Sequence, residues 1–353
     1  MKSHKFARSS FVLFAVAFLL STLALSAAPT VEVIMRNLDN PRGLALGPEG
    51  GLYVAEAGRG GAGPCQTLRG ALQCYGPTGG VTRLWGGHQE RVITGLPSQV
   101  DPAGQALGPQ DISFQGRGGA FITVGFGGEP SLRSRFGPGG EIFGTLIHAP
   151  ASGNWKVIAD ISDYEAKANP AGGIIDTNPF GILAEPSSRV ITDAGGNDLL
   201  RIEANGKIST IATFPSRPAR STDAVPTGFT VGPDGAYYVG ELTGAPFTAG
   251  AARVYRVVPG SAPQVVLEGF KAILDLSFGP DGSLFVVEFS AGPASGLAAA
   301  GRLIRVRPNG TREVVLDGLD HPTSVLVDPD DGTIYVTNRG TSVGNGEVLK
   351  VTP

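Results

Sequence analysis

Short apolar runs separated by tight turns recur along most of the chain. Six segments align with one another, and each reads as a strand, a turn and a second strand. They are RGLALGPEGGLYVAE from Arg42, QDISFQGRGGAFITV from Gln110, FGILAEPSSRVITD from Phe180, TGFTVGPDGAYYVGE from Thr227, LDLSFGPDGSLFVVE from Leu274 and TSVLVDPDDGTIYVTN from Thr323. Turns such as Gly232-Pro233-Asp234-Gly235 place proline and glycine where a β-turn needs them. The pattern predicts one β-hairpin per segment.

Each hairpin is followed by further apolar strands. The third strands are VTRLW from Val81, LIHAP from Leu146, LLRIE from Leu199, VYRVV from Val254, LIRVR from Leu303 and VLKVT from Val348. In five of the six repeats another apolar strand follows. Four antiparallel strands repeated at about 40–50 residues are typical of propeller blades. We therefore predict an all-β, six-bladed β-propeller that forms a single domain over residues 29–353.

The last repeat lacks a fourth strand of its own. It ends at Pro353 after three strands, while the apolar segment from Val31 to Met35 stands alone before the first repeat. An unpaired strand edge exposes backbone groups that need partners. We therefore expect the N-terminal strand to close the last blade.

Residues 1–28 have the pattern of a secretory signal peptide. A basic start precedes an uninterrupted apolar run over residues 11–20, and small residues stand at 26–28. The run is shorter than the roughly 20 residues needed to cross a bilayer. We therefore expect cleavage after residue 28, a secreted or periplasmic protein, and no membrane insertion.

The charge of the chain argues against nucleic acid as a partner. The formal net charge is −3 at pH 7, and removal of residues 1–28 takes away three positive charges, which leaves −6. Nucleic-acid affinity comes mostly from neutralising phosphates with basic side chains. We exclude nucleic acid and anionic membranes as partners, and we expect a monomer.

Long insertions lie on one side of the predicted propeller. They fall between second and third strands or between blades, at roughly residues 57–80, 125–143, 166–178, 242–252 and 289–301. Loops on a rigid scaffold often carry recognition. We expect this loop-rich face to bind a small molecule, a glycan or a protein. A capping box at Ser162 to Glu165 predicts one short helix that ends before Pro170.

The first insertion contains both cysteines of the chain, Cys65 and Cys74. In an exported protein, two cysteines that close a loop of about ten residues favour a disulfide. Free thiols or a metal site are the alternatives, and two lone cysteines are a poor ligand set for zinc.

Oxygen-bearing side chains gather where the second strands end. The column contains Glu56, Asp193, Glu241, Glu288 and Asn338, with Val124 as the exception. Asp111, Asp275 and Asn178 add oxygens near the axis, and hard cations such as Ca²⁺ bind to oxygens of this kind. Candidate metal ligands are Asp111, Asp275 and Glu288. The alternative is structural, because a carboxylate at a strand end often accepts N–H bonds from the adjoining loop.

Basic residues form a second column in the third strands. They are Arg83, His148, Arg201, Arg256, Arg305 and Lys350. Their position in mid-strand, in all six repeats, predicts pairing with carboxylates and carbonyls of neighbouring strands rather than an anion site. His321 opens the last blade at the axial rim, and it is a candidate acid–base group or ligand with a structural role as the alternative.

Several segments resemble the ScyD/ScyE family, which is named for scytonemin biosynthesis. They are NPRGLALGPEGGLYVAEAGRGGAGPC from Asn40, CYGPTGGVTR from Cys74, DTNPFGILAE from Asp176, DAGGNDLLR from Asp193 and VGPDGAYYVGELTGAPFTAGAARVYRV from Val231. The resemblance implies an exported propeller distantly similar to NHL-repeat and gluconolactonase-like proteins. Family members tend to carry histidine where this chain has Gln110. That difference weakens any metal site built on a pair at Gln110 and Asp111.

Two functions fit these observations. The leading prediction is a binding or scaffold module that uses the loop-rich face, because no nucleophile–base pair is recognisable and no catalytic residue is assigned. The alternative is a divalent-cation-dependent, lactonase-like hydrolase with Ca²⁺ at the axial rim polarising a carbonyl. It requires several oxygens to converge at about 2.3–2.6 Å from one ion. These would come from Asp111, Asn178, Asp193, Glu241, Asp275 and Glu288.

Overall fold

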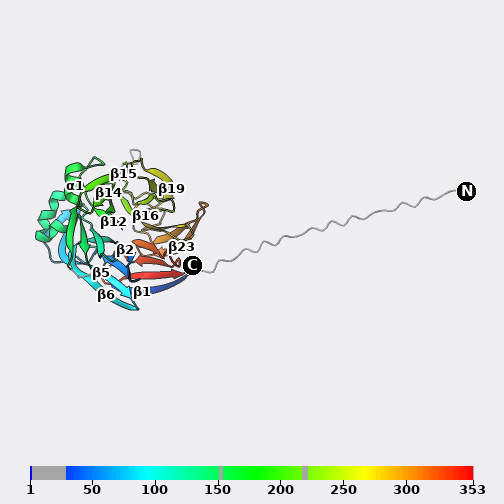
Figure 1. The fold of residues 1–353 in the computed structure, drawn as a ribbon, viewed down its shortest axis with the longest axis horizontal. Helices are drawn as coiled ribbons and strands as arrows, with labels where there is room; N and C mark the ends of the chain where they lie inside the picture. The colour runs from blue at the N-terminus through cyan, green and yellow to red at the C-terminus, as the bar shows by residue number, and fades with distance from the viewer. Residues whose placement is uncertain (2–28, 151–153, 217–221, 353) are drawn as a thin grey trace.

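Six antiparallel sheets form a ring (Figure 1). The structure is a computed structural model that describes residues 1, 29–150, 154–216 and 222–352, so residues 2–28 of the predicted signal peptide lie outside it. The predicted all-β, six-bladed propeller is confirmed. Among the described residues, no helix has the length and apolar character to span a membrane.

Within blades 1 to 5 the strands run in chain order from the axis outward, and blade 6 does so for its three inner strands. Blade 1 contains β2 (Pro41–Leu46), β3 (Leu52–Glu56), β5 (Ala71–Trp85) and β6 (His88–Val100), with β4 (Cys65–Leu68) beside β5 and β7 (Ala106–Leu107) beside β6. Blade 2 contains β8 (Pro109–Phe114), β9 (Ala120–Val124), β10 (Thr145–Ala149) and β11 (Lys156–Asp160). Blade 3 contains β12 (Pro179–Ala184), β13 (Ser188–Asp193), β14 (Asp198–Glu203) and β15 (Ile208–Thr213).

The other three blades follow the same plan. Blade 4 contains β16 (Pro226–Val231), β17 (Tyr237–Glu241), β18 (Ala252–Val257) and β19 (Gln264–Phe270). Blade 5 contains β20 (Ile273–Phe278), β21 (Leu284–Glu288), β22 (Gly301–Val306) and β23 (Arg312–Leu319). Blade 6 contains β24 (Ser324–Val327), β25 (Ile334–Asn338) and β26 (Gly346–Thr352).

The N-terminal strand lies in the sheet built by the C-terminal strands. β1 (Thr30–Leu38) pairs antiparallel with β26, so that Val31 lies opposite Val351 and Glu32 opposite Lys350. This makes β1 the outer strand of blade 6. The innermost strands contact one another in the order β2, β8, β12, β16, β20 and β24, and β24 contacts β2 again.

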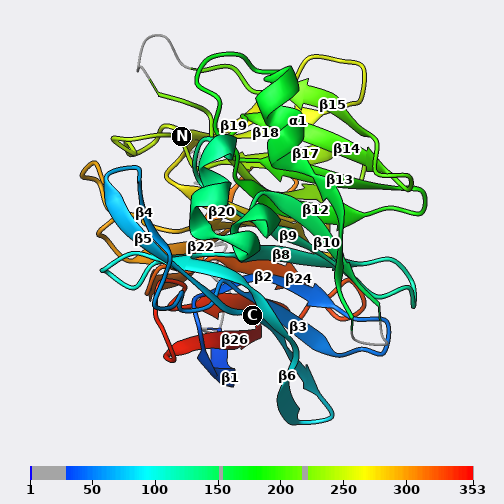
Figure 2. The ribbon, with the colours of Figure 1, turned by 90° about the vertical axis from the view of Figure 1, so that its left-hand side faces the viewer.

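The first insertion is a β-ribbon rather than the expected loop. β5 begins at Ala71, well before the predicted strand start at Val81, and pairs with β4. Cys65 and Cys74 lie opposite each other in this pairing and form a disulfide, as predicted. In Figure 2 the ribbon of β4 and β5 projects from the left-hand side of the view.

The second insertion contains two 3-10 helices that were not predicted, Pro130–Phe136 and Pro138–Ile142. In the sequence, the proline and glycine residues of this segment are typical of a turn, so no helix was expected. In the fold, Phe136 packs against Phe126 and Phe143, with ring centroids 6.2 and 5.7 Å away, and all three rings are fully buried. The insertion therefore carries its own apolar core.

One α-helix follows blade 2, and its start differs from the prediction. α1 (Ile161–Ala168) is capped by Asp160, whose side chain accepts the Asp163 N–H at 2.9 Å. Ser162, the predicted cap, instead lies buried in the first turn. Arg133 holds Asp160 with bonds of 2.9 and 3.1 Å, which joins α1 to the 3-10 helices beside it (Figure 2).

Candidate functional site

The carboxylates at the strand ends are buried and already bonded. Glu56 accepts the Asp39 N–H at 2.6 Å, a hydrogen bond from the Thr82 hydroxyl, and an ion pair from Arg91 at 2.5 Å. Its side chain is completely buried. The loop that enters blade 1 is therefore anchored to the end of β3.

Two other blades repeat this arrangement with an arginine. Glu288 accepts the Lys271 N–H at 2.7 Å and pairs with Arg302 at 2.5 Å. Glu241 pairs with Arg253 at 3.2 Å. Both carboxylates are buried, so their charge is balanced by a guanidinium within the same blade.

Asp193 is held by hydrogen bonds alone. Its Oδ1 accepts N–H bonds from Asn178 at 2.6 Å, Gly195 at 2.9 Å and Gly196 at 3.0 Å, while Oδ2 accepts the Thr177 hydroxyl at 2.7 Å. Bonds of this kind fix the two loops that meet at the end of β13. This geometry favours the structural interpretation of the strand-end column.

Blade 6 uses an amide for the same purpose. Asn338 Oδ1 accepts the Asp320 N–H at 2.8 Å, and its amide donates to Glu347 at 2.8 Å. His321 has both ring nitrogens bonded, to Asp320 Oδ1 at 2.7 Å and to the Leu297 carbonyl at 3.1 Å. These contacts favour a structural role for His321.

The basic column pairs across strands in five blades, as predicted. Arg256 contacts Asp234 at 2.6 Å and Arg305 contacts Asp281 at 2.5 Å. The others are Arg83 with Glu49 and Glu90, Arg201 with Glu185, and His148 with the Gly118 carbonyl. This column therefore stabilises blades and offers no anion-binding ring.

The innermost strands place two carboxylates near the axis. At the third position of the six aligned innermost segments stand Gly43, Asp111, Gly181, Gly228, Asp275 and Ser324. Asp111 and Asp275 are half-buried. They occupy equivalent positions three blades apart, so each half of the propeller contributes one.

Asp111 joins neighbouring blades through its two oxygens. Oδ1 accepts the Ile112 N–H at 2.8 Å, and Oδ2 accepts the Ile182 N–H of blade 3 at 2.9 Å. A Cβ added to Gly43 in blade 1 would lie 1.9 Å from Oδ1. The carboxylate therefore fills the space that the missing side chain of Gly43 leaves.

Asp275 repeats this geometry between blades 4 and 6. Its Oδ1 accepts the Leu276 N–H at 2.9 Å, while Oδ2 accepts the Ser324 hydroxyl at 2.6 Å and the Val325 N–H at 3.1 Å. A Cβ on Gly228 would lie 2.2 Å from Oδ1. The same arrangement of carboxylate, N–H donors and facing glycine therefore occurs in both halves of the propeller.

The two aspartates influence each other's charge. Burial raises the pKa of Asp111 well above its ordinary value, and the negative charge of Asp275 raises it further. Burial raises the pKa of Asp275 to about 6, against the hydrogen bonds from Ser324 and Val325. No arginine or lysine forms an ion pair with either residue among the ion pairs of the described chain. The pair is therefore an uncompensated acidic site.

The described residues do not bring together all the oxygens that were expected to form the metal site. Within the described ranges, no three acidic, histidine or cysteine side chains form a ready ligand set. Glu241 and Glu288 pair with arginines, and Asp193 is saturated by N–H and hydroxyl donors. Among the predicted residues that the structure describes, Asp111 and Asp275 are the two acids without an ion-pair partner whose charges affect each other: the charge of Asp275 raises the pKa of Asp111.

Two buried polar residues near the start of the innermost strands were missed as candidates. Arg42 donates to the carbonyls of Gly340 and Ala106, the latter at 2.7 Å, and burial lowers its pKa to about 10. Gln110, at the equivalent position of blade 2, is buried, and neither amide atom has a partner. The sequence feature that could have identified Arg42 and Gln110 is a polar residue within an otherwise apolar strand.

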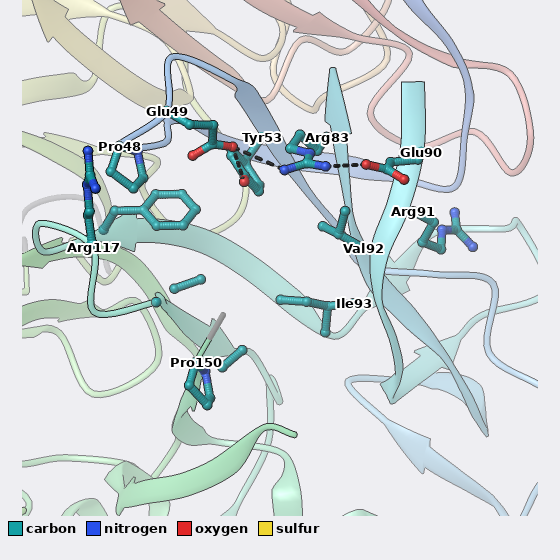
Figure 3. Close-up of a pocket in the computed structure, with 14 residues that line it drawn as sticks. Pro48, Glu49, Tyr53, Arg83, Glu90, Arg91, Val92, Ile93, Arg117 and Pro150 are labelled. Carbon is teal, nitrogen blue, oxygen red and sulfur yellow. Dashed lines mark hydrogen bonds and ion pairs between the residues drawn. The ribbon is translucent and has the colours of Figure 1, made fainter. Parts of the chain in front are cut away.

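A pocket of about 420 Å³ opens between blades 1 and 2 (Figure 3). It lies against the short turns, at Pro48, Arg117 and Pro150, and not on the loop-rich face. Figure 3 shows Arg83 bonded to both Glu49 and Glu90, so these charges are satisfied without a ligand.

A second pocket of about 350 Å³ occupies the equivalent place between blades 4 and 5. The same aromatic pair lines each of them, Tyr53 with Phe114 in the first and Tyr238 with Phe278 in the second, at 4.7 and 5.0 Å. The repetition indicates that these grooves arise from blade geometry. They do not point to a specific ligand.

Comparison with known proteins shows the fold and no family. No protein-family model matches the chain, and no curated protein matches its sequence. A putative oxidoreductase (glucose dehydrogenase) from Thermus thermophilus is 18% identical, covers 92% of this chain and 100% of its own, and has a TM-score of 0.57. A gluconolactonase from Xanthomonas campestris is 8% identical, with coverage of 92% and 89% and a TM-score of 0.55.

A putative gluconolactonase is also similar, at 11% identity, 93% coverage of both chains and a TM-score of 0.54. At these identities the likeness concerns architecture only. The resemblance to the ScyD/ScyE family stays a prediction. The chain is a six-bladed β-propeller, and two of these structural neighbours are described as gluconolactonases, one of them as putative.

Proposed function

We propose that this protein is a divalent-cation-dependent hydrolase of lactone-type esters, with its site between Asp111 and Asp275. The observation that carries the proposal is the uncompensated acid pair near the axis. Both carboxylates have raised pKa values, because they are buried and, for Asp111, because the other charge is close. A pair of this kind needs a proton or a cation to balance it.

The chain's own residues prepare this position for a cation. Main-chain N–H bonds fix both carboxylates, and the Ser324 hydroxyl fixes Oδ2 of Asp275. Carboxylate oxygens keep further lone pairs after accepting such bonds. Three of the other four positions in this ring are glycine, which leaves room for a ligand beside the pair. A calcium ion bound here would supply Lewis-acid polarisation of a carbonyl oxygen.

The structural neighbours support the reaction class by analogy. Two of them are described as gluconolactonases, and that activity is theirs. The fold alone hosts many activities, so the proposal depends on the acid pair. Calcium and lactone substrates remain the parts to be tested.

A pH-stat assay with glucono-δ-lactone and simple δ-lactones tests the proposal. We expect hydrolysis by the mature chain in CaCl2, loss of hydrolysis in EDTA, and recovery on adding calcium. Asp275→Asn and Asp111→Asn should each lower kcat by roughly 100-fold, because losing Lewis-acid polarisation costs several kcal/mol of barrier. Asp101→Asn, a half-buried acid in the turn after β6, serves as the matched control.

Circular dichroism of each variant confirms that it is folded. Equal rates in Asp275→Asn and in the control, or no hydrolysis of any lactone at millimolar calcium, would overturn the proposal.

The predicted binding or scaffold role is the second candidate. Gln110 favours it, because a buried amide without partners suits a polar ligand on the loop-rich side. In that case sugars would raise the thermal midpoint of the protein while the lactone assay stays silent.

A further inference from the structure

Acidic side chains, three of them buried, gather beside α1 and away from Asp111 and Asp275, which we call the channel pair. A Cβ added to Gly196 would lie 3.1 Å from Glu165 Oε2 and 3.4 Å from Asp193 Oδ2, so α1 and the end of β13 meet here. Asp198 begins β14, and Asp176 lies in the segment before β12. We call Glu165, Asp176, Asp193 and Asp198 the α1 acidic cluster.

Positive charge is scarce around this cluster. Arg69 pairs with Asp176 Oδ2 at 2.5 Å, but the Arg69 side chain is 55% exposed. Burial raises the pKa of Glu165 to about 7, and the charges of Asp193 and Asp176 add to the effect. Burial also raises the pKa of Asp198 well above its ordinary value, with Asp193 and Glu165 adding to it. The cluster therefore holds more negative charge than its surroundings balance.

Several oxygens at this place have no hydrogen-bond donor. They are both carboxylate oxygens of Asp198, Oε1 of Glu165, Oδ1 of Asp176 and the hydroxyl of Ser162. Asp198 is fully buried and Glu165 is 2% exposed. Ser162 and Glu165 are three residues apart on α1, so they share one face of the helix. Buried oxygens normally find a donor or a cation.

Asp193 takes hydrogen-bond donors that its acidic neighbours therefore lack. Its Oδ1 accepts three main-chain N–H groups, from Asn178, Gly195 and Gly196. Both oxygens of Asp198 and Oε1 of Glu165 are left without a donor, whereas Asp176 has Arg69 as its partner. They surround Asp193 from α1, from the start of β14 and from the segment before β12.

We propose that the α1 acidic cluster binds one calcium ion, with Glu165 and Asp198 as its carboxylate ligands. Calcium accepts about six to eight oxygens in flexible geometry. Since no three acids in the described chain form a ready ligand set, the hydroxyl of Ser162, main-chain carbonyls and water complete the shell. Zinc prefers nitrogen and sulfur, which these residues lack.

This site is independent of the proposed function. Its ligands come from α1 and blade 3, whereas the channel pair comes from β8 and β20. The ion would tie α1 to the turn between β13 and β14. Its expected role is to hold this part of the loop-rich side in place.

Isothermal titration calorimetry with CaCl2 tests the proposal on the EDTA-treated, dialysed chain. The parent protein carries Asp275→Asn, so that the channel pair does not contribute. We expect one calcium ion per chain. Asp198→Asn and Glu165→Gln should each weaken binding at least about 10-fold, while Glu129→Gln, an exposed acid outside the cluster, should bind like the parent. Calcium should raise the thermal midpoint of the parent and the control only.

Two results would overturn the proposal. One is the absence of binding at millimolar calcium, which is the outcome if the cluster shares protons instead of holding an ion. The other is equal affinity in Asp198→Asn, Glu165→Gln and the control. Because the channel pair is disabled throughout, failure of the lactone assay and failure of this titration are separate results.

Discussion

Glu56→Ala is expected to lower the free energy of unfolding by about 3 kcal/mol. The side chain is completely buried and binds the Asp39 N–H, the Thr82 hydroxyl and Arg91. Its removal leaves the Asp39 N–H and the Thr82 hydroxyl without their acceptor, and it leaves Arg91 with Asp39 as its acidic partner; each buried donor without an acceptor costs about 1–3 kcal/mol. Denaturant unfolding followed by circular dichroism measures the change.

A surface glutamate of the same blade provides the control. Glu90 also pairs with an arginine, Arg83, but its side chain is 48% exposed. Exposed pairs contribute roughly 0–1 kcal/mol, so Glu90→Ala should have little effect. Equal losses for Glu56→Ala and Glu90→Ala would show that Glu56 does not anchor the loop, and would reopen its assignment to a ligand site.

Gly43→Ala is expected to destabilise the protein by about 2–3 kcal/mol. Its new Cβ would lie 1.9 Å from Asp111 Oδ1 and 2.8 Å from the Asp111 Cα, so both the carboxylate and strand β8 must move. The move also breaks the bond from Ile182 to Asp111 that joins blades 2 and 3. Thermal and denaturant unfolding measure the loss.

Gly118→Ala is the matched control, because the nearest atom to its new Cβ is the Gln115 carbonyl oxygen at 3.2 Å. We expect a cost below about 1 kcal/mol there. In an Asp111→Ala background the cost of Gly43→Ala should fall, since the clashing oxygen is gone. An unchanged cost in that background would contradict the placement of Asp111 against blade 1.

The repeat could be predicted because local turn chemistry and apolar alternation recur in every blade. The same information reveals a column of acids at the strand ends, but not where their oxygens point. Glu56 and Glu288 turn to loop N–H groups and arginines that are distant in the sequence. Only the folded chain shows that these acids are paired with arginines, while Asp111 and Asp275 accept hydrogen bonds but have no ion-pair partner among the described residues.

Irregular segments were the least predictable part. Ser162 and Asp160 are both good caps by residue type, and the contact of Asp160 with Arg133 helps select the second. In the sequence, Glu165 belongs to the predicted capping box and Asp198 has no predicted role, because the two residues lie in different elements. Their proximity depends on how α1 packs against blade 3.

Anomalous diffraction from crystals soaked in TbCl3, a calcium substitute, tests the central claim most directly. The account predicts a peak near the axis within about 2.3–2.6 Å of carboxylate oxygens of Asp111 and Asp275, lost in Asp275→Asn. A saturated crystal with no peak between these two side chains would contradict it.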